Sequence, residues 1–446
     1  MAWDILPTQA NLKGDPGRPV VSVFGGAGGL SLGFALAGLK PLISVDNDED
    51  ACRTYQRNIG PIKHADITAL DPSDLLRDLG LGRGEVFALI GGPPCQGFSS
   101  AGAKNPNDPR NALVFQYLRF VEYIMPDWFV FENVEGILTS RQGNSLYDLI
   151  KELIKLGYVI RVDKVNCAAY GVPQSRKRVF ITGSRVVDRF TFPTPTHSFQ
   201  SGRDYHRGPS QEAPCVLDAL SDLPSPSAKN ERIKYTTVPK TEIQRWLRAD
   251  ADSVSLHYVR RLSEVNRRRI AALQQGQTMK DLPEDLWHPS YRRRAHRRVM
   301  DGTPSERRGG APAGMRRLVG SEPSKTITAQ APSEFVHPVE NRMLTLRECA
   351  RLQSFPDWFE FDGTASSIAR QIGNAVPPMM AFVLARHILQ ISEMDGNRRR
   401  SDSAGGLLEF RIVNGNGVSP ALASTIKKLE SLLTKPQQLS FNIGGG

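Results

Sequence analysis

The stretch "GGPPCQGFSS" (91–100) places a thiol where it could react. Cys95 follows two prolines and the apolar run 86–90, in a loop at the point where a predicted strand ends. A structural cysteine behaves as a small hydrophobe and usually lies inside a helix or strand. A loop position suits a nucleophile better, provided that a positive or helix-terminal environment lowers the thiol pKa from about 8.5. An unreactive, solvent-facing thiol is the alternative.

Charged and amide side chains follow Cys95 at spacings that suit the same site. Glu132 in "FENV" ends the apolar run 127–133, and open α/β sheets build their sites at the carboxyl ends of parallel strands. In "YGVPQSRKRVFITG", Gln174, Arg176 and Arg178 alternate, so an extended chain points all three side chains the same way. This pattern predicts a row of donors aimed at one target. A lysine-paired carboxylate and a solvated basic strand edge are the alternatives.

The loop "FGGAGG" is a near miss for a dinucleotide-binding fingerprint. Gly26 and Gly28 have the required spacing, but Ser31 stands where the third Gly or Ala belongs. Asp46 follows Gly26 by twenty residues, at the end of the second predicted strand, and suits a ribose diol. The pattern favours a cofactor that carries a ribose but need not carry phosphate. A glycine turn with no ligand is the alternative.

Predicted strands alternate with predicted helices and would bring these residues to one edge of a sheet. On the predicted helix 111–125, the residues Val114, Leu118, Val121 and Met125 have the spacing of one apolar face. Such alternation indicates an α/β fold with a mostly parallel sheet covered on both sides. The runs that predict strands are "PVVSVFGG", "KPLISVD", "EVFALIG" and "DWFVFEN".

Composition divides the chain into segments. After about residue 190 the sequence becomes rich in Pro, Ser and Gly, and strand-like order returns near residue 323. Between residues 260 and 317, fifteen Lys or Arg face six Asp or Glu. We expect a leader at 1–18, a first domain at 19–189, a basic insert at 190–322, a return to the first domain at 323–395, and a linker with a C-terminal tail at 396–446.

Overall composition narrows the class of protein. The 446 residues are 40% hydrophobic, which predicts two to three domains with sizeable cores. The net charge of +11 favours a polyanionic partner. Five scattered cysteines without a CxxC pair predict reduced thiols and no zinc site. Without an apolar run of about 18 residues or a signal-peptide pattern, the expected location is the cytoplasm.

The motifs together resemble the DNA (cytosine-5)-methyltransferase family, prokaryotic type, over nearly the full length of the chain. One departure is Ser22, where the family usually has Asp. The matching blocks, in the order of the family, are "FGGAGGLSLGF", "VDND", "HADI", "GGPPCQGFS", "DPRNALVFQYLRF", "FENV", "YGVPQSRKR", "TLRECARLQSFP" and "QIGNAVPP".

This resemblance implies a Rossmann-like S-adenosylmethionine-dependent core (19–189) with a smaller, irregular target-recognition domain (190–322). It implies methyl transfer to C5 of a flipped-out cytosine in a specific double-stranded DNA sequence, through a covalent bond between Cys95 and C6. Glu132 would act at N3, and Arg176 and Arg178 would hold the base carbonyl and nearby groups. The implied S-adenosylmethionine-binding residues are Phe24, Gly26, Gly28, Gly29, Asp46, Asp66, Ile67 and Asn374.

The resemblance also implies partners and leaves alternatives. The stretch from Gln96 to Arg110, with Gly97 and Gly102 as hinges, would close over the DNA. A cognate restriction endonuclease would be a further partner, and the chain would act as a monomer. An RNA (tRNA) cytosine-5 methyltransferase and a non-catalytic DNA-binding module are the alternative functions. The size of the basic insert favours duplex DNA over tRNA.

Overall fold

A computed structural model shows how the chain folds around the predicted edge. The nucleophile candidate Cys95 and the predicted closing loop Gln96–Arg110 lie outside the described residues. The described residues are 6–12, 17–94, 113–202, 204–209, 211–289, 291–292, 314–394, 405–413 and 418–434.

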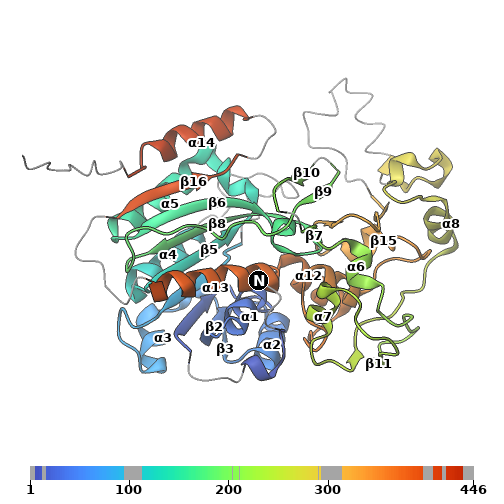
Figure 1. Cartoon of the computed structure of the whole chain (residues 1–446), viewed down its shortest axis with the longest axis horizontal. Helices are drawn as coiled ribbons and strands as arrows, with labels where there is room; N and C mark the ends of the chain where they lie inside the picture. Colours follow the sequence, from blue (N-terminus) through green and yellow to red (C-terminus); the bar gives the residue numbers. More distant parts are fainter. Residues whose placement is uncertain are drawn as a thin grey trace, which may run out of the picture.

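Among the described residues, eight strands form one central sheet in the order β16-β6-β8-β5-β4-β1-β2-β3 (Figure 1). Neighbouring strands run parallel except β8, which is antiparallel to both β5 and β6. The prediction of a mostly parallel sheet is therefore confirmed. The strands are β1 (Pro19–Val23), β2 (Lys40–Asp46), β3 (Ile62–His64), β4 (Ala88–Gly91), β5 (Trp128–Asn133), β6 (Val159–Asn166), β8 (Lys177–Ser184) and β16 (Gly406–Arg411).

Helices cover both faces of this sheet, because alternate strand residues point to opposite faces. On β5, Trp128 and Val130 belong to one apolar cluster and Phe129 and Phe131 to the other. The first cluster includes α1 (Gly29–Leu36) and α13 (Pro378–Met394). The second includes α3 (Pro72–Leu79), α4 (Leu113–Ile124), α5 (Asn144–Lys155) and α14 (Pro420–Glu430).

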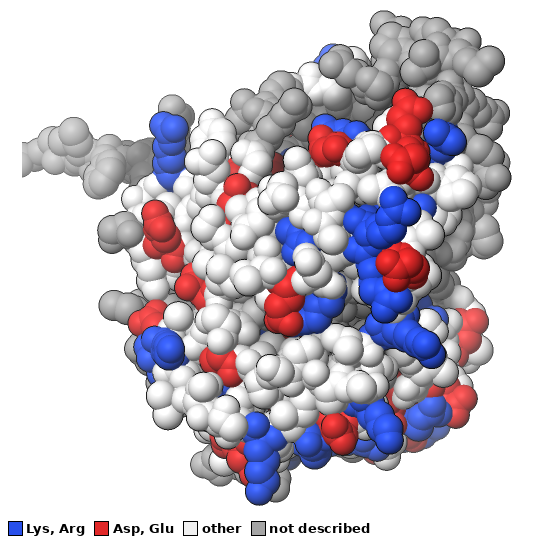
Figure 2. Space-filling model, turned by 90° about the vertical axis from the view of Figure 1, so that its right-hand side faces the viewer, with Lys and Arg blue, Asp and Glu red and all other residues white. Residues whose placement is uncertain are grey.

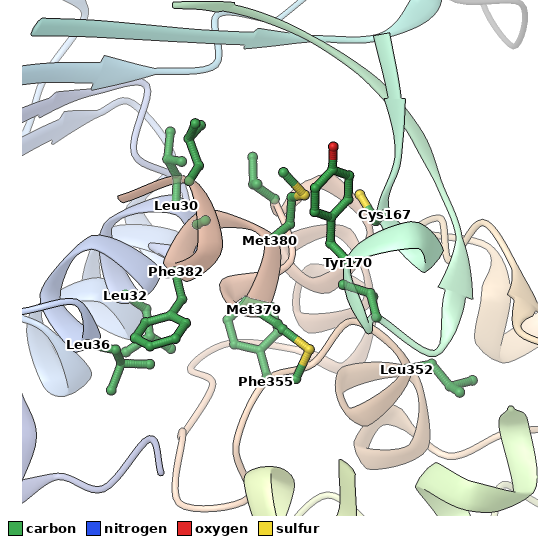
Figure 3. Close-up of a cluster of buried hydrophobic side chains, with 14 of the residues drawn as sticks. Leu30, Leu32, Leu36, Cys167, Tyr170, Leu352, Phe355, Met379, Met380 and Phe382 are labelled. Atoms are coloured by element: carbon green, nitrogen blue, oxygen red, sulfur yellow. The ribbon is translucent and has the colours of Figure 1, made fainter. Parts of the chain in front are cut away.

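Helices α1 and α13 pack closely, because glycine removes side-chain bulk from their contact. A Cβ at Gly33 would lie 2.4 Å from the Ala381 Cβ. Figure 3 shows Phe382 of α13 beside Leu32 and Leu36 of α1. The helical stretch Ala365–Met394 is long and apolar enough to cross a membrane, but 67% of its most apolar window is buried inside the protein. We interpret this stretch as a core helix.

The predicted apolar face of the 111–125 helix is confirmed, because all four of its residues belong to or pack against the second cluster. Val114 and Val121 are buried, whereas Leu118 is only partly buried and Met125 follows the end of α4 with a φ of 49°. The buried face also includes the aromatic side chains Tyr117 and Phe120 together with Ile124. The prediction considered only aliphatic residues and therefore omitted the two aromatic residues of this buried face.

The basic insert has little regular structure, as predicted. Its described part contains short helices and two-stranded pairs, and the start of the returning chain packs against it. The Trp246 indole Nε1 donates to the Ser354 carbonyl (3.2 Å), and Arg351 forms buried ion pairs with Asp222 and Asp357. The elements of the insert are β9 (Phe199–Ser201), β10 (Asp204–His206), α6 (Val216–Leu220), β11 (Ile233–Lys234), α7 (Glu242–Arg248), β12 (Ser253–Val254), α8 (Glu264–Ala272) and β13 (Arg316–Arg317). The returning chain adds β14 (Ser324–Lys325), which pairs with β7 (Gln174–Ser175) of the first domain, and α10 (Ala331–Glu334), β15 (Phe335–Val336) and α11 (Leu346–Leu352).

Two further elements belong to the larger part of the molecule. Helix α2 (Glu49–Asn58) follows β2, and α12 (Ala365–Asn374) precedes α13. The C-terminal tail, expected as a linker and appendage, adds β16 parallel to β6, and α14 contacts α5 (Figure 1). The tail thus extends the sheet at its edge.

Candidate active site

Glu132 lies at the carboxyl end of β5 and points to the face covered by α1 and α13, because Trp128 and Val130 share this face. It pairs directly with Phe180 of β8, and Arg178 lies two residues along β8 on the same face. The Arg178 Nε lies 2.9 Å from the Glu132 Oε1. The structure therefore brings these two predicted catalytic residues into an ion pair.

The environment of Glu132 opposes its ionisation. The residue is 8% exposed, and burial raises the pKa of its carboxyl, while the positive charges of Arg178 and Arg176 lower the pKa by a smaller amount. A carboxyl with a raised pKa beside a cation can hold a proton or share one with a bound base. Glu132 is therefore suited to proton transfer.

The segment that leads to Cys95 is attached to the end of β5. A Cβ at Gly92 would lie 3.0 Å from the Glu132 Oε2, and the Asn133 Nδ2 donates to the Pro93 carbonyl (3.2 Å). Cys95 follows Pro93 by two residues in the sequence and lies outside the described range. Gly92 and Pro93, which precede Cys95 in the sequence by three and two residues, therefore lie beside Glu132 and Asn133.

The prediction that Gln174, Arg176 and Arg178 point at one target is wrong. The Gln174 Nε2 donates to the Leu352 carbonyl (3.0 Å), and the Arg176 guanidinium donates to the Ile327 and Gly373 carbonyls (3.0 and 2.9 Å). The strand is interrupted at Arg176, between β7 and β8. Only Arg178 reaches Glu132 through a direct contact.

Arg176 is an internal support of the predicted cofactor site. It is 1% exposed, and burial, together with the charge of Arg178, lowers its pKa to about 9. Its Nη2 donates to the carbonyls of Gly373 and Ala375 (2.9 and 3.0 Å), which flank Asn374. Arg176 therefore holds the backbone on both sides of a predicted cofactor-binding residue.

The glycine loop between β1 and α1 needs its glycines for two reasons. Phe24, Gly26 and Gly28 have positive φ values of 56°, 53° and 96°. A Cβ at Gly28 would lie 2.2 Å from the Ile59 Cδ1, and one at Gly29 would lie 2.3 Å from the Val376 carbonyl oxygen. A Cβ at Gly26 would meet no atom within 4 Å, so Gly26 borders open space. The loop therefore packs against the protein at Gly28 and Gly29 and is open at Gly26, which suits a ligand.

Asp46 anchors this loop from the end of β2. Its carboxylate accepts hydrogen bonds from the backbone N–H of Gly26 (2.7 Å) and Asp48 (2.9 Å). Burial raises the pKa of Asp46, and these hydrogen bonds lower it by a smaller amount. Because a carboxylate has about four acceptor positions, Asp46 can still accept from a ribose diol.

The remaining predicted cofactor residues lie along the same edge. Asp66 follows β3, which pairs with β2 at Asp46, and it accepts from the Thr68 N–H (2.9 Å), which lowers its pKa. Ile67 is 5% exposed, whereas the side chain of Asn374 is exposed at the end of α12. The carboxylates, the amide and the apolar side chain fit an adenosine-containing cofactor.

Ser22, the predicted departure from the family pattern, lies under the glycine loop together with residues that the sequence did not point to. Ser22 is 1% exposed, and a Cβ at Gly25 would lie 2.0 Å from the Ser44 Oγ and 3.3 Å from the Ser22 Oγ. Both hydroxyls therefore lie directly under the glycine loop. The Arg370 Nη2 donates to the Asp48 Oδ2 (2.7 Å), a contact between residues 322 positions apart. The acidic cluster "VDNDED" was the available signal for Asp48.

Known proteins share the sequence and the fold of this chain. A family profile described as C-5 cytosine-specific DNA methylase matches residues 19–390. The chain is 35% identical over 426 residues to Type II methyltransferase M.AgeI of Thalassovita gelatinovora, covering 82% of this chain and 98% of that protein. It is 34% identical to Type II methyltransferase M.DdeI of Desulfomicrobium norvegicum, covering 83% and 88%.

A solved structure shows the same fold. It is described as a DNA modification methyltransferase encoded within a prophage (E. coli), with a TM-score of 0.66 and 24% identity. The alignment covers 84% of this chain and 99% of the solved one. The chain therefore belongs to the C-5 cytosine-specific DNA methylase family and is a DNA (cytosine-5)-methyltransferase.

Proposed function

We propose that this enzyme methylates C5 of a flipped-out cytosine in a specific duplex DNA sequence, with Cys95 as nucleophile. The observation that carries the proposal is the buried Glu132–Arg178 pair at the end of β5, joined through Gly92 and Pro93 to the segment that holds Cys95. A nucleophile and a proton-transfer group at adjacent strand ends are what this chemistry requires.

The Cys95 thiolate would attack C6 and form a carbon–sulfur bond. The electrons of the C5–C6 double bond then make C5 nucleophilic, and negative charge develops on the ring. Glu132, whose pKa is raised by burial, would donate or share a proton at N3, and Arg178 would keep its carboxyl in place. C5 would then take the methyl group, and S-adenosylhomocysteine would leave. Transfer of the C5 proton to solvent would re-form the C5–C6 double bond and expel the Cys95 thiolate.

S-adenosylmethionine would supply the methyl group from its sulfonium centre. Asp46 would accept from the ribose, Asp66 and Ile67 would meet the adenine, and Asn374 would close the pocket. Phe24, Gly26, Gly28 and Gly29 would form the floor of this pocket, and the open space above Gly26 supports this assignment. Arg176 would act as a positioning residue, because its hydrogen bonds reach the backbone around Asn374.

Duplex DNA would bind to the face that carries the basic insert. A cytosine in the stack is inaccessible, so the enzyme must flip it out at a cost of a few kcal/mol. We assign catalysis to residues 19–189 with 323–395, and sequence recognition to residues 190–322. The band of Lys and Arg side chains on the insert end of the molecule (Figure 2) supports a phosphate-binding role.

The relatives favour DNA over tRNA as substrate. M.AgeI and M.DdeI are both named Type II methyltransferases and align over more than 80% of this chain. We propose that this chain likewise serves a restriction-modification system in the cytoplasm, as a monomer beside a cognate endonuclease. The buried Glu132–Arg178 pair argues against a non-catalytic DNA-binding module, because binding alone does not require a buried carboxyl of raised pKa.

The experiment that tests the proposal traps the covalent bond. Base-resolution methylation mapping of DNA from expressing cells identifies the target, and a duplex is then made with 5-fluorocytosine at that position. Fluorine cannot leave C5 as a cation, so wild-type enzyme with S-adenosylmethionine should form a protein–DNA adduct that survives a denaturing gel. The Cys95→Ser variant should form none. Normal methylation of ordinary target DNA without an adduct on the fluorinated duplex would rule out the covalent mechanism.

A further inference from the structure

A cavity of about 290 Å³ lies where the insert meets α10 and α12. Its polar lining residues are Arg260, Arg370, Ser333, Ser366 and Gln330. No carboxylate is among the described residues that line it. Two positive charges with hydroxyl and amide donors form an environment that suits an anion with several oxygens.

The two arginines of this cavity differ in their partners. Arg260 is exposed, and no ion pair to it occurs among the described residues. Arg370 is about half exposed, with a side-chain exposure of 51%, and forms an ion pair with Asp48. One guanidinium is thus available to an anion, and the other can bind an anion with the donors that Asp48 does not use. Guanidinium has five donors, so sharing is possible.

The segments around Ala329 and Gly373 separate the cavity from Arg176 and the predicted cofactor site. A Cβ at Gly373 would lie 2.4 Å from the Ala329 N, so these two segments touch. On the other side of this contact, Arg176 donates to the carbonyls of Gly373 and Ile327. An anion in the cavity would therefore lie near the backbone of Gly373 and Asn374, which Arg176 holds through its hydrogen bonds.

A continuous series of contacts joins the cavity to the glycine loop. The Arg370 Nη2 donates to the Asp48 Oδ2 (2.7 Å), and the Asp48 N–H donates to the Asp46 Oδ1 (2.9 Å). The Asp46 Oδ2 then accepts from the Gly26 N–H (2.7 Å). A ligand that orders the half-exposed Arg370 side chain would also order Asp48, and with it the carboxylate assigned to the cofactor ribose.

We propose that this cavity binds a backbone phosphate of the DNA and that Arg370 couples DNA binding to cofactor binding. The inference rests on the function proposed above. Coupling is positive, because the first ligand orders the shared Arg370–Asp48–Asp46 contacts and the second ligand then loses less conformational entropy. Linkage makes the effect reciprocal, so DNA and cofactor tighten the binding of each other by the same factor, at least about fivefold.

The test separates the two arginines. The affinity of a mixed-sequence duplex is measured over a range of salt concentrations, and S-adenosylhomocysteine is titrated by calorimetry with and without saturating duplex. Arg260→Ala should lower the slope of log K against log salt by about one. It should leave cofactor-site affinity without DNA unchanged, and abolish the gain that DNA confers. Arg370→Gln should lower the slope and also weaken S-adenosylhomocysteine binding without DNA.

Two further variants serve as controls. Asp48→Asn should remove the coupling while the salt slope stays at the wild-type value, because the asparagine lacks the charge that holds Arg370. Arg77→Ala, on the remote helix α3 and paired with Asp74, should change neither quantity. Thermal unfolding of each variant shows that it is folded.

The possible outcomes distinguish a failure of the phosphate-site proposal from a failure of the proposed methyltransferase function. An unchanged salt slope in Arg260→Ala, or undiminished coupling in Arg370→Gln, overturns the proposal. If inorganic phosphate tightens S-adenosylhomocysteine binding in wild type and duplex does not, the cavity is a free-phosphate site, which also overturns it. Methylation of target DNA by the same wild-type preparation separates these results from a failure of the proposed function, which absent methylation would indicate.

Discussion

Two carboxylates end parallel strands of the same sheet, and their surroundings differ. Glu132 after β5 is buried, and Asp46 after β2 is partly buried; burial raises the pKa of both. The groups that oppose this rise at Glu132 are the cations Arg178 and Arg176. At Asp46 they are mainly backbone N–H groups, those of Gly26 and Asp48.

This difference explains how one sheet edge supports two functions. Backbone N–H groups are fixed by the loop that carries them, so they hold the Asp46 oxygens in place as acceptors. A guanidinium instead stabilises the ionised carboxylate through its charge, in competition with burial. Burial therefore favours the protonated form of Glu132 and the arginine charges oppose it, whereas fixed N–H groups hold Asp46 as an acceptor. The predictions below test this distinction, from the largest expected effect to the smallest.

Glu132→Gln should lower the rate of methyl transfer by about 10²- to 10⁴-fold, because the amide keeps the shape of the side chain but cannot transfer a proton in the same way. Transfer of tritiated methyl groups to the target duplex measures this rate. Binding of S-adenosylmethionine, measured by calorimetry, should stay at the wild-type value. A rate near that of wild type would remove Glu132 from the proposed chemistry.

Asp46→Asn should show the opposite pattern. Loss of charge-assisted hydrogen bonds at about 1.5 to 3 kcal/mol should weaken S-adenosylmethionine binding roughly 10- to 100-fold. Duplex affinity without cofactor should be unchanged, because Asp46 lies at the glycine loop and not in the basic cavity. Calorimetry and a gel-shift titration measure the two affinities. Equal cofactor affinity in the variant would contradict the assigned ribose contact.

Arg178→Gln should change the pH dependence of catalysis. The charge of Arg178 lowers the pKa of Glu132, so its removal should raise that pKa further. If protonated Glu132 is the active form, the pH at which the rate falls on the alkaline side should also move upward. Rates measured across the pH range test this shift. A downward shift would mean that the ionised form is active.

Thr425→Val should have the smallest effect and should act on stability. The buried Thr425 Oγ1 donates to the Leu138 carbonyl (2.5 Å), beside a turn in which Arg141, Gln142 and Gly143 all have positive φ. Losing this bond should cost about 1 to 3 kcal/mol and lower the melting temperature by a few degrees.

Ser424→Ala is the matched control for this tail contact. Its hydroxyl donates to the Gln142 carbonyl (3.2 Å) at an exposed position, so its loss should change stability by less than about 0.5 kcal/mol. S-adenosylmethionine affinity should be unchanged in both variants, because the tail supports the segment after β5 and not the glycine loop. A loss of cofactor affinity in Thr425→Val would show that the tail contact also affects the glycine loop.

The sequence by itself determined the elements and their order. Period-two and period-3.6 patterns depend on neighbouring residues, so the runs before Asp46 and Glu132 identified β2 and β5 without knowledge of the fold. The glycine turn after β1 was also predictable, because glycine favours positive φ at Gly26 and Gly28. Parallel strands bring their carboxyl ends to one edge, which placed both carboxylates on the same side of the sheet.

The tertiary structure alone decided which side chains meet. Arg176 and Arg178 are alike in the sequence, yet Arg176 binds carbonyls of the returning chain and Arg178 binds Glu132. The Arg370–Asp48 contact and the pairing of β16 with β6 likewise join segments more than 200 residues apart. Local patterns specify the conformation of a segment. The partner of a buried charge depends on which distant segment packs against it, and this depends on the fold as a whole.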